Sequence, residues 1–217
     1  RSNIADVVHH TTKHLRTGVG LPTRAAAAST VVHLCEQFPN EMRRFAEGVF
    51  MSLLRQLTGT ALHSQTLFDA SLSALGSLSK LLEGSELRTV LCGICEKYRT
   101  MPSDDPKLAE TLGATASRIV SRSGDAIPPK DPAWEPILMT ACVGSFDNDA
   151  RVKSHWSLVL EEGCTAAGYG NKTAAVQQYV EFAISLCMQL LQQLSWPRRR
   201  QGIHALDEVF AAVEKQQ

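Results

Sequence analysis

The chain has 217 residues, and its 22 basic side chains balance 22 acidic ones, so the formal net charge is zero. A general nucleic-acid binder carries a basic excess, which this composition lacks. No run of residues approaches the ~18 consecutive apolar side chains of a membrane-spanning helix. The first residue is Arg and no signal peptide opens the sequence, so we expect a piece of a longer polypeptide.

The first predicted helix pair occupies residues 1–38. Residues 4–16 have an imperfect apolar face, and a glycine-containing break then ends at Pro22. Proline suits the first turn of a helix because its missing N–H would be unpaired there anyway. Arg24 follows in the same turn, where the helix dipole disfavours a cation. We therefore expect an acidic or carbonyl partner for Arg24 on a neighbouring turn.

The second and third pairs follow with short breaks between the helices. Asn40 is the expected N-cap of a helix over 41–57, and further helices are predicted over 64–82 and 85–98. A turn-rich break then precedes a helix over 106–122. These segments complete the second and third pairs.

The last two pairs come after a proline-rich linker over 124–132. Helices are predicted over 132–146, 149–163 and 171–194, and the last of these is the longest in the chain. Pro197 opens the final helix, in which five apolar residues are expected to face inward: Ile203, Leu206, Val209, Phe210 and Val213. No segment alternates apolar and polar residues as a half-buried strand does, so no strand is assigned.

The second helices of the pairs begin at about residues 22, 64, 106, 149 and 197, which are separated by 42, 42, 43 and 48 residues. This spacing is the period of HEAT and armadillo repeats. A basic residue recurs just after four of the starts, at Arg24, Lys107, Arg151 and Arg198, whereas Gln65 takes that place in the second repeat. We predict an all-α fold, an α-solenoid of about five HEAT-like helix pairs. It forms one domain over 1–217, with approximate repeats 1–38, 39–83, 84–124, 130–167 and 170–217.

Motifs for catalysis and for cofactor or metal binding are not recognised in the sequence. His10 and His14 stand four residues apart, but no Glu follows His10, so a polar helix face is preferred to a metal site. Cys92 and Cys95 lie in mid-helix with no strand before them and no second pair, so both are interpreted as core residues. The six cysteines fit the reduced core of a cytosolic or nuclear protein. We expect no catalytic residue, no cofactor, no metal and no enzyme activity.

Several short motifs occur in an order that resembles one family. They are Gly18-x-Gly20-Leu21-Pro22-Thr23-Arg24, then Ala74-Leu75-Gly76-x-Leu78, Trp156 with Glu161, and Ser195-Trp196 followed by Gln201-Gly202-x-x-Ala205. This ordered set is similar to the C-terminal region of the large HEAT-repeat proteasome adaptor and scaffold family. The resemblance implies a non-enzymatic scaffold that touches the proteasome core particle and the regulatory ATPase particle. It also implies cytoplasmic and nuclear placement and a role in proteasome assembly quality control.

Two other classes of protein stay open. Another HEAT or armadillo adaptor, such as a transport receptor or a phosphatase scaffold, shares the period but not the ordered motifs. A HEAT-like DNA glycosylase needs a basic groove with a carboxylate and aromatic residues, and the zero net charge argues against it. The expected partners are therefore proteins, with no nucleic acid and no membrane insertion.

A protein-binding patch is predicted at the start of the final helix. Arg198, Arg199 and Arg200 occupy its first turn, where each cation opposes the positive end of the helix dipole. In one interpretation Arg198 is the repeat arginine, paired inside the solenoid, and its two neighbours are solvated. In the other, Arg199 and Arg200 face an acidic partner surface and Trp196 is the anchor, since tryptophan is enriched at interface centres.

Overall fold

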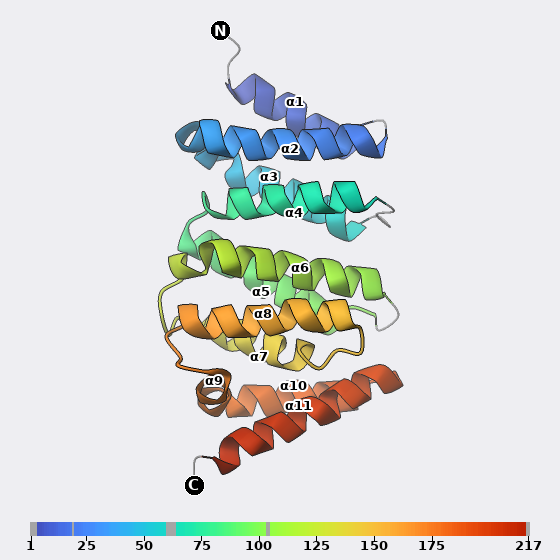
Figure 1. The fold of residues 1–217 in the computed structure, drawn as a ribbon, viewed down its shortest axis with the longest axis vertical. Helices are drawn as coiled ribbons and strands as arrows, with labels where there is room; N and C mark the ends of the chain where they lie inside the picture. Colours follow the sequence, from blue (N-terminus) through green and yellow to red (C-terminus); the bar gives the residue numbers. More distant parts are fainter. Residues whose placement is uncertain (1–3, 19, 60–63, 103–104, 216–217) are drawn as a thin grey trace. The chain divides into compact units, whose positions relative to one another are not determined.

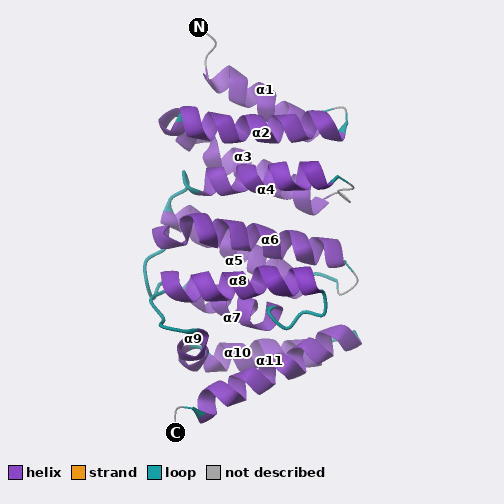
Figure 2. Cartoon of the chain, viewed as in Figure 1, coloured by secondary structure: helices purple, strands orange, loops and turns teal. Residues whose placement is uncertain are grey.

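The computed structural model describes residues 4–18, 20–59, 64–102 and 105–215, and all regular secondary structure within them is helical (Figures 1 and 2). The helices follow one another as consecutive pairs, which confirms the predicted all-α solenoid class. The outer limits of the first and last predicted repeats, residues 1 and 217, lie outside the described residues. The chain divides into two compact units, Arg1–Leu87 and Arg88–Gln217.

The first unit contains four helices that stack as two pairs: α1 (Ile4–Thr17), α2 (Leu21–Gln37), α3 (Pro39–Gly59) and α4 (Gln65–Ser79). The α2 helix packs along α4, and α1 packs on both α2 and α3. The largest fully buried side chains of this unit are aliphatic, with one phenylalanine: Leu15, Met42, Phe50, Leu53, Leu67, Leu75, Leu78 and Leu87. Burial of such side chains is the main source of stability in this unit.

The turn between α1 and α2 depends on two glycines. A Cβ on Gly18 would lie 2.4 Å from the carbonyl oxygen of His14, and Gly20 has a φ of +95°, which side chains rarely adopt. Arg24 donates from Nε to the carbonyl oxygen of Gly18 at 3.2 Å. The carbonyl partner predicted for Arg24 is therefore confirmed.

The predicted N-cap of α3 is wrong. The helix begins at Pro39, so Asn40 lies inside its first turn instead of preceding it. The sequence expectation followed the high capping propensity of asparagine, but the helix begins two residues earlier than predicted, with Pro39 in its first turn.

The second unit contains most of α5 (Gly84–Thr100) and all later helices. They are α6 (Pro106–Ser123), the short 3-10 helix η1 (Gly124–Ala126), α7 (Trp134–Gly144), α8 (Ala150–Ala166), α9 (Lys172–Gln178), α10 (Val180–Leu191) and α11 (Trp196–Glu214). Within this unit α6 packs on α8, α7 packs on α8 and α10, and α10 packs on α11.

Second helices begin close to the positions that the repeat period predicts. Three of them carry a side-chain cap: Ser64 accepts from the backbone N–H of Leu67, Asp105 from that of Leu108, and Asp149 from those of Arg151 and Val152. Short polar side chains before a helix satisfy N–H groups that lack an intrahelical partner. Local sequence chemistry therefore sets where these helices start.

Trp156 is the centre of the core of the second unit. Its side chain is fully buried, and its ring lies 4.7 Å from the ring of Tyr98, centroid to centroid. A Cβ on Gly144 would come within 2.4 Å of Trp156 Cγ, and one on Gly113 within 3.2 Å of Trp156 Nε1. The two glycines therefore make the space that the indole fills.

The longest predicted helix, 171–194, is two helices in the structure. The chain breaks between α9 and α10 at Tyr179, which has φ −118° and ψ 31°. The hydroxyl of Tyr169 donates to that of Tyr179 at 2.9 Å, and the two rings meet edge to face. This contact comes from the loop before α9, so the apolar pattern of the helix does not reveal it.

The inward face predicted for α11 is partly wrong. Val209 is buried, but Ile203 is 43% exposed and Phe210 is 52% exposed. The buried face carries mostly small residues, and a Cβ on Gly202 would lie 3.0 Å from Leu190 Cβ on α10. Because the two helices approach this closely, small residues face inward and larger apolar ones face solvent.

Candidate protein-interaction site

The N-terminal end of α11 is held by a buried arginine. Arg198 is 6% exposed, and its guanidinium lies 5.0 Å from the ring centroid of Tyr98. Its Nη1 donates to Gln201 Oε1 at 3.1 Å and lies 3.7 Å from Asp147 Oδ2. Arg198 is therefore paired inside the solenoid, as the first of the two interpretations predicts for this residue.

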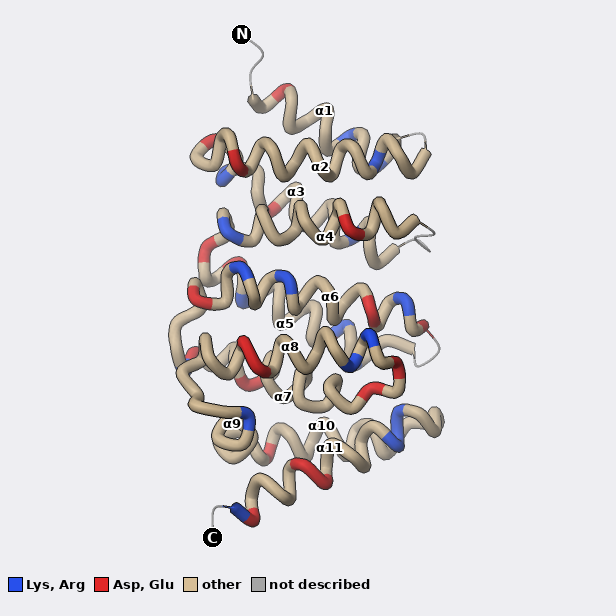
Figure 3. Tube along the Cα trace, viewed as in Figure 1, with Lys and Arg blue, Asp and Glu red and all other residues tan. Residues whose placement is uncertain are grey.

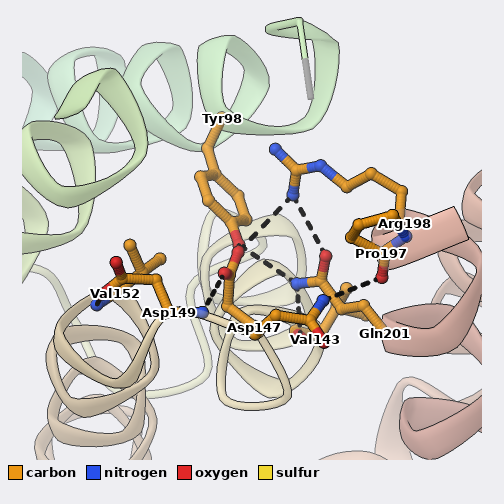
Figure 4. A network of polar contacts seen from close by, with 9 residues as sticks. Tyr98, Val143, Asp147, Asp149, Val152, Pro197, Arg198 and Gln201 are labelled. Atoms are coloured by element: carbon orange, nitrogen blue, oxygen red, sulfur yellow. Dashed lines mark hydrogen bonds and ion pairs between the residues drawn. The ribbon is translucent and has the colours of Figure 1, made fainter. Parts of the chain in front are cut away.

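Tyr98, Asp147 and Gln201 extend this contact into a network that joins three elements (Figure 4). The Tyr98 hydroxyl donates to Asp147 Oδ2 at 2.7 Å and accepts from Gln201 Nε2 at 3.1 Å. The same Gln201 nitrogen also donates to the carbonyl oxygen of Val143 at 3.0 Å. Burial, with the neighbouring Asp147 charge as a further cause, raises the pKa of Tyr98 above its ordinary value. The neutral phenol is therefore the stable form.

The loop between α7 and α8 connects this network to two helix starts. Asp147 Oδ1 accepts from the backbone N–H of Asp149, which in turn caps α8. Asn148 Nδ2 donates to the carbonyl oxygen of Pro197 in the first turn of α11 at 3.0 Å. One short loop thus fixes the start of α8 and the start of α11 relative to each other.

The three residues predicted to bind a partner lie together on the surface beside this anchored arginine. Trp196 is 62% exposed, and the guanidinium of Arg199 lies 5.6 Å from its ring centroid. Arg199 also donates to the carbonyl oxygen of Leu194 at 3.4 Å, and Arg200 Nε donates to His204 Nε2 at 3.4 Å. Leu194, which is 97% exposed, adds an aliphatic side chain. We call Leu194, Trp196, Arg199 and Arg200 the α11 patch.

The charge of the α11 patch is not neutralised by a nearby carboxylate. Across the described parts of the chain, no ion pair involves Arg199 or Arg200. Basic positions gather at this end of α11 in Figure 3. Since the helix dipole also disfavours cations there, an acidic partner surface would gain a favourable interaction that the chain itself does not supply.

The remaining sequence candidates do not form a site in the described residues. His10 and His14 are exposed on α1, and no group of three or more metal-ligating side chains was found within the described ranges. Cys95 is buried, which confirms its interpretation as a core residue, whereas Cys92 is only half-buried. Burial raises the pKa of the Cys95 thiol to about 12, so it is a poor nucleophile.

Sequence reasoning missed the residues that position the α11 patch. Tyr98, Asp147 and Gln201 are far apart in the chain, and only Gln201 appeared in a motif. From the sequence, the run Asp147-Asn148-Asp149 predicts only a cap for the helix that follows it. The signal that was available is Asp147, an acidic residue in the loop before one second helix, which lies opposite Arg198 of the next repeat.

The helix pairs and their period define the class of this protein: a HEAT-type helical-repeat protein. Residues 1–99 match the family described as "Proteasome adapter and scaffold protein ECM29, HEAT-repeat domain". The chain is 25% identical over 221 residues to "Proteasome adapter and scaffold protein ECM29" of Homo sapiens, covering 99% of this chain and 11% of that protein. The resemblance inferred from the ordered motifs is confirmed.

Three of the solved structures to which the chain is similar are designed or engineered proteins. Two crystal structures of engineered proteins cover 95% of this chain, with 13% identity and a TM-score of 0.46 for one, and 17% identity and 0.49 for the other. The similarity extends over 97% of the first engineered chain and 49% of the second. A designed armadillo repeat protein in complex with a (KR)4 peptide has 12% identity and a TM-score of 0.35, with 95% and 92% of the two chains covered.

Proposed function

We propose that this chain is part of a non-enzymatic scaffold that links the proteasome core particle to the regulatory particle. The observation that carries the proposal is the similarity to human ECM29, a proteasome adapter and scaffold protein, over 99% of the chain. The chain spans 11% of that relative, so it supplies one region of such a scaffold. Stacked helix pairs fit this role because they present long surfaces for binding proteins.

The proposal includes the domain organisation, location and partners expected from the sequence. The chain forms one HEAT-repeat domain of a longer polypeptide that works in the cytoplasm and the nucleus. Its partners are subunits of the core and regulatory particles, bound without a cofactor or metal. No helix in the described part of the chain is long and apolar enough to cross a membrane.

The α11 patch is the contact surface that we assign to this function. Trp196 and Leu194 supply exposed apolar area, and Arg199 and Arg200 supply charge that forms no ion pair with the described residues. Aromatic and arginine side chains dominate binding energy at many interfaces. The buried Arg198 network holds the first turn of α11 in place, which reduces the entropy lost when the patch is covered.

The test is direct binding to purified core and regulatory particles, offered separately and assembled. We expect the chain to bind, and Arg199→Glu with Arg200→Glu to weaken binding by about tenfold or more. The matched control is Arg55→Glu with Lys153→Glu, which changes net charge equally at exposed positions of α3 and α8. Absence of binding to either particle would refute the scaffold role, and full binding by the folded Arg199/Arg200 variant would refute the patch.

A further inference from the structure

A second surface feature, a groove in the first unit, stands apart from the α11 patch. It runs between α1 and α3 and has a volume of about 330 Å³. Its floor is apolar, with buried Val8 from α1 and buried Val49 beside half-buried Phe45 from α3. The groove therefore offers an apolar seat for a side chain from outside.

The rim of the groove is cationic. Arg16 from α1 and Arg44 from α3 both line it, and His9 adds an imidazole. Arg16 is oriented by its Nε, which donates to Ser52 Oγ at 2.9 Å, and the guanidinium of Arg44 lies 4.7 Å from the Phe45 ring centroid. None of the described residues that line the groove carries a carboxylate. Within the described ranges neither arginine forms an ion pair, whereas the adjacent Arg43 pairs with Glu83 at 3.0 Å.

Gly48 keeps the groove open. It lies in the middle of α3, is exposed, and lines the groove, and a Cβ built on it meets no atom within 4 Å. Glycine inside a helix is destabilising relative to alanine, and here no close packing of the described chain requires it. A side chain at this position would project into the space between α1 and α3.

We propose that this groove binds a short acidic segment of a protein partner. Carboxylates of the segment pair with Arg16 and Arg44, and an apolar side chain between them rests on Val8 and Phe45. The charge of the rim, which no internal carboxylate neutralises, selects an acidic occupant, and the apolar floor selects a peptide over a nucleic acid. This site is independent of the proteasome proposal, so either can fail without the other.

The test measures binding of a fluorescent peptide in which a central leucine is flanked by aspartate and glutamate, using anisotropy at low salt. We expect saturable binding that weakens with salt, and loss of about tenfold in affinity for the same peptide with Asn and Gln in place of the acids. Arg44→Glu should cause a similar loss. Arg16 is left unchanged because its bond to Ser52 ties it to the fold.

Gly48→Leu is the variant that separates the groove from general surface charge. It should abolish peptide binding by filling the space while the helix content stays the same. Gly93→Leu is its matched control, since Gly93 is also an exposed glycine in mid-helix with open space around it, and it does not line the groove. Gly48→Ala should raise the melting temperature by about 2 °C, showing that α3 tolerates a side chain there.

Three outcomes would overturn the proposal. They are no binding of the acidic peptide, equal binding of the Asn/Gln peptide, and undiminished binding by folded Gly48→Leu. Tighter binding of a duplex DNA of similar length would overturn it as well, because the apolar floor would then have no role.

Discussion

Arg24 in the first unit and Arg198 in the second occupy the same place in their repeats, one or two residues after a proline that opens a second helix. Their surroundings differ. Arg24 is half-exposed and donates to one backbone carbonyl, that of Gly18. Arg198 is buried and contacts Asp147, Gln201 and the ring of Tyr98. The repeat pattern therefore predicts the position of each arginine in the sequence. The residues around each arginine determine how much its side chain contributes to stability.

The difference follows from what precedes each helix. Before α2 the chain turns through two glycines, which offer only backbone groups. Before α11 the partner comes from a different loop, where Asp147 supplies a carboxylate of which 14% is exposed. Because the Asp147 carboxylate is largely buried, removal of the Arg198 cation would leave an unpaired buried charge and destabilise the fold.

Loss of the Arg198 side chain should have the largest effect. We expect Arg198→Ala to lower the free energy of unfolding by about 3 kcal/mol, because it leaves Asp147 buried without its cation. Urea denaturation of the whole chain, followed by circular dichroism, measures this. A loss below ~1 kcal/mol would mean that water replaces the guanidinium and that the two arginines are equivalent.

Tyr98→Phe should have an intermediate effect of about 1–1.5 kcal/mol, because the hydroxyl serves both Asp147 and Gln201. Burial raises the pKa of Tyr98 in the folded chain, so its contribution is complete below about pH 10 and is lost as the pH rises further. The stability difference between wild type and Tyr98→Phe should therefore shrink above pH 10. A constant difference across that range would contradict the buried neutral phenol.

Arg24→Ala should have the smallest effect, about 0.5 kcal/mol or less. The variant loses one partly exposed hydrogen bond but also removes a cation from the first turn of α2, and the two effects oppose each other. The same urea experiment gives the comparison with Arg198→Ala. An equal loss for both would show that position in the repeat, and not burial, sets the contribution.

The helical class and the starts of the second helices could be predicted from the sequence because they depend on local chemistry. Proline, aspartate or serine stands at the start of each second helix, and the period of 42 to 48 residues is visible in the spacing of these starts. The placement of Trp196, Arg199 and Arg200 on one helix end follows from Pro197 alone. None of these inferences needs knowledge of what a helix packs against.

The faces and the network could not be predicted because they depend on how closely helices approach. The apolar pattern predicts Ile203 and Phe210 on the inward face, yet the close contact of α11 with α10 places Gly202 and other small residues there. Gly144 lies within the helix predicted over 132–146, and the sequence gives no sign that its missing side chain makes room for the Trp156 ring. In both cases a glycine allows close packing at a buried position, whereas patterns of apolar residues assign such positions to large side chains.

The hydrogen bond from Gln201 to Tyr98 joins residues that are 103 positions apart in the sequence. A complete helix pair, α7 and α8, lies between them in the chain. Repeat proteins usually make contacts only between adjacent repeats, so their stability is a sum of nearest-neighbour steps and their ends fray independently. In the second unit this bond closes a long loop through the third, fourth and fifth repeats. We therefore expect α11 to unfold together with α5, instead of fraying independently of it.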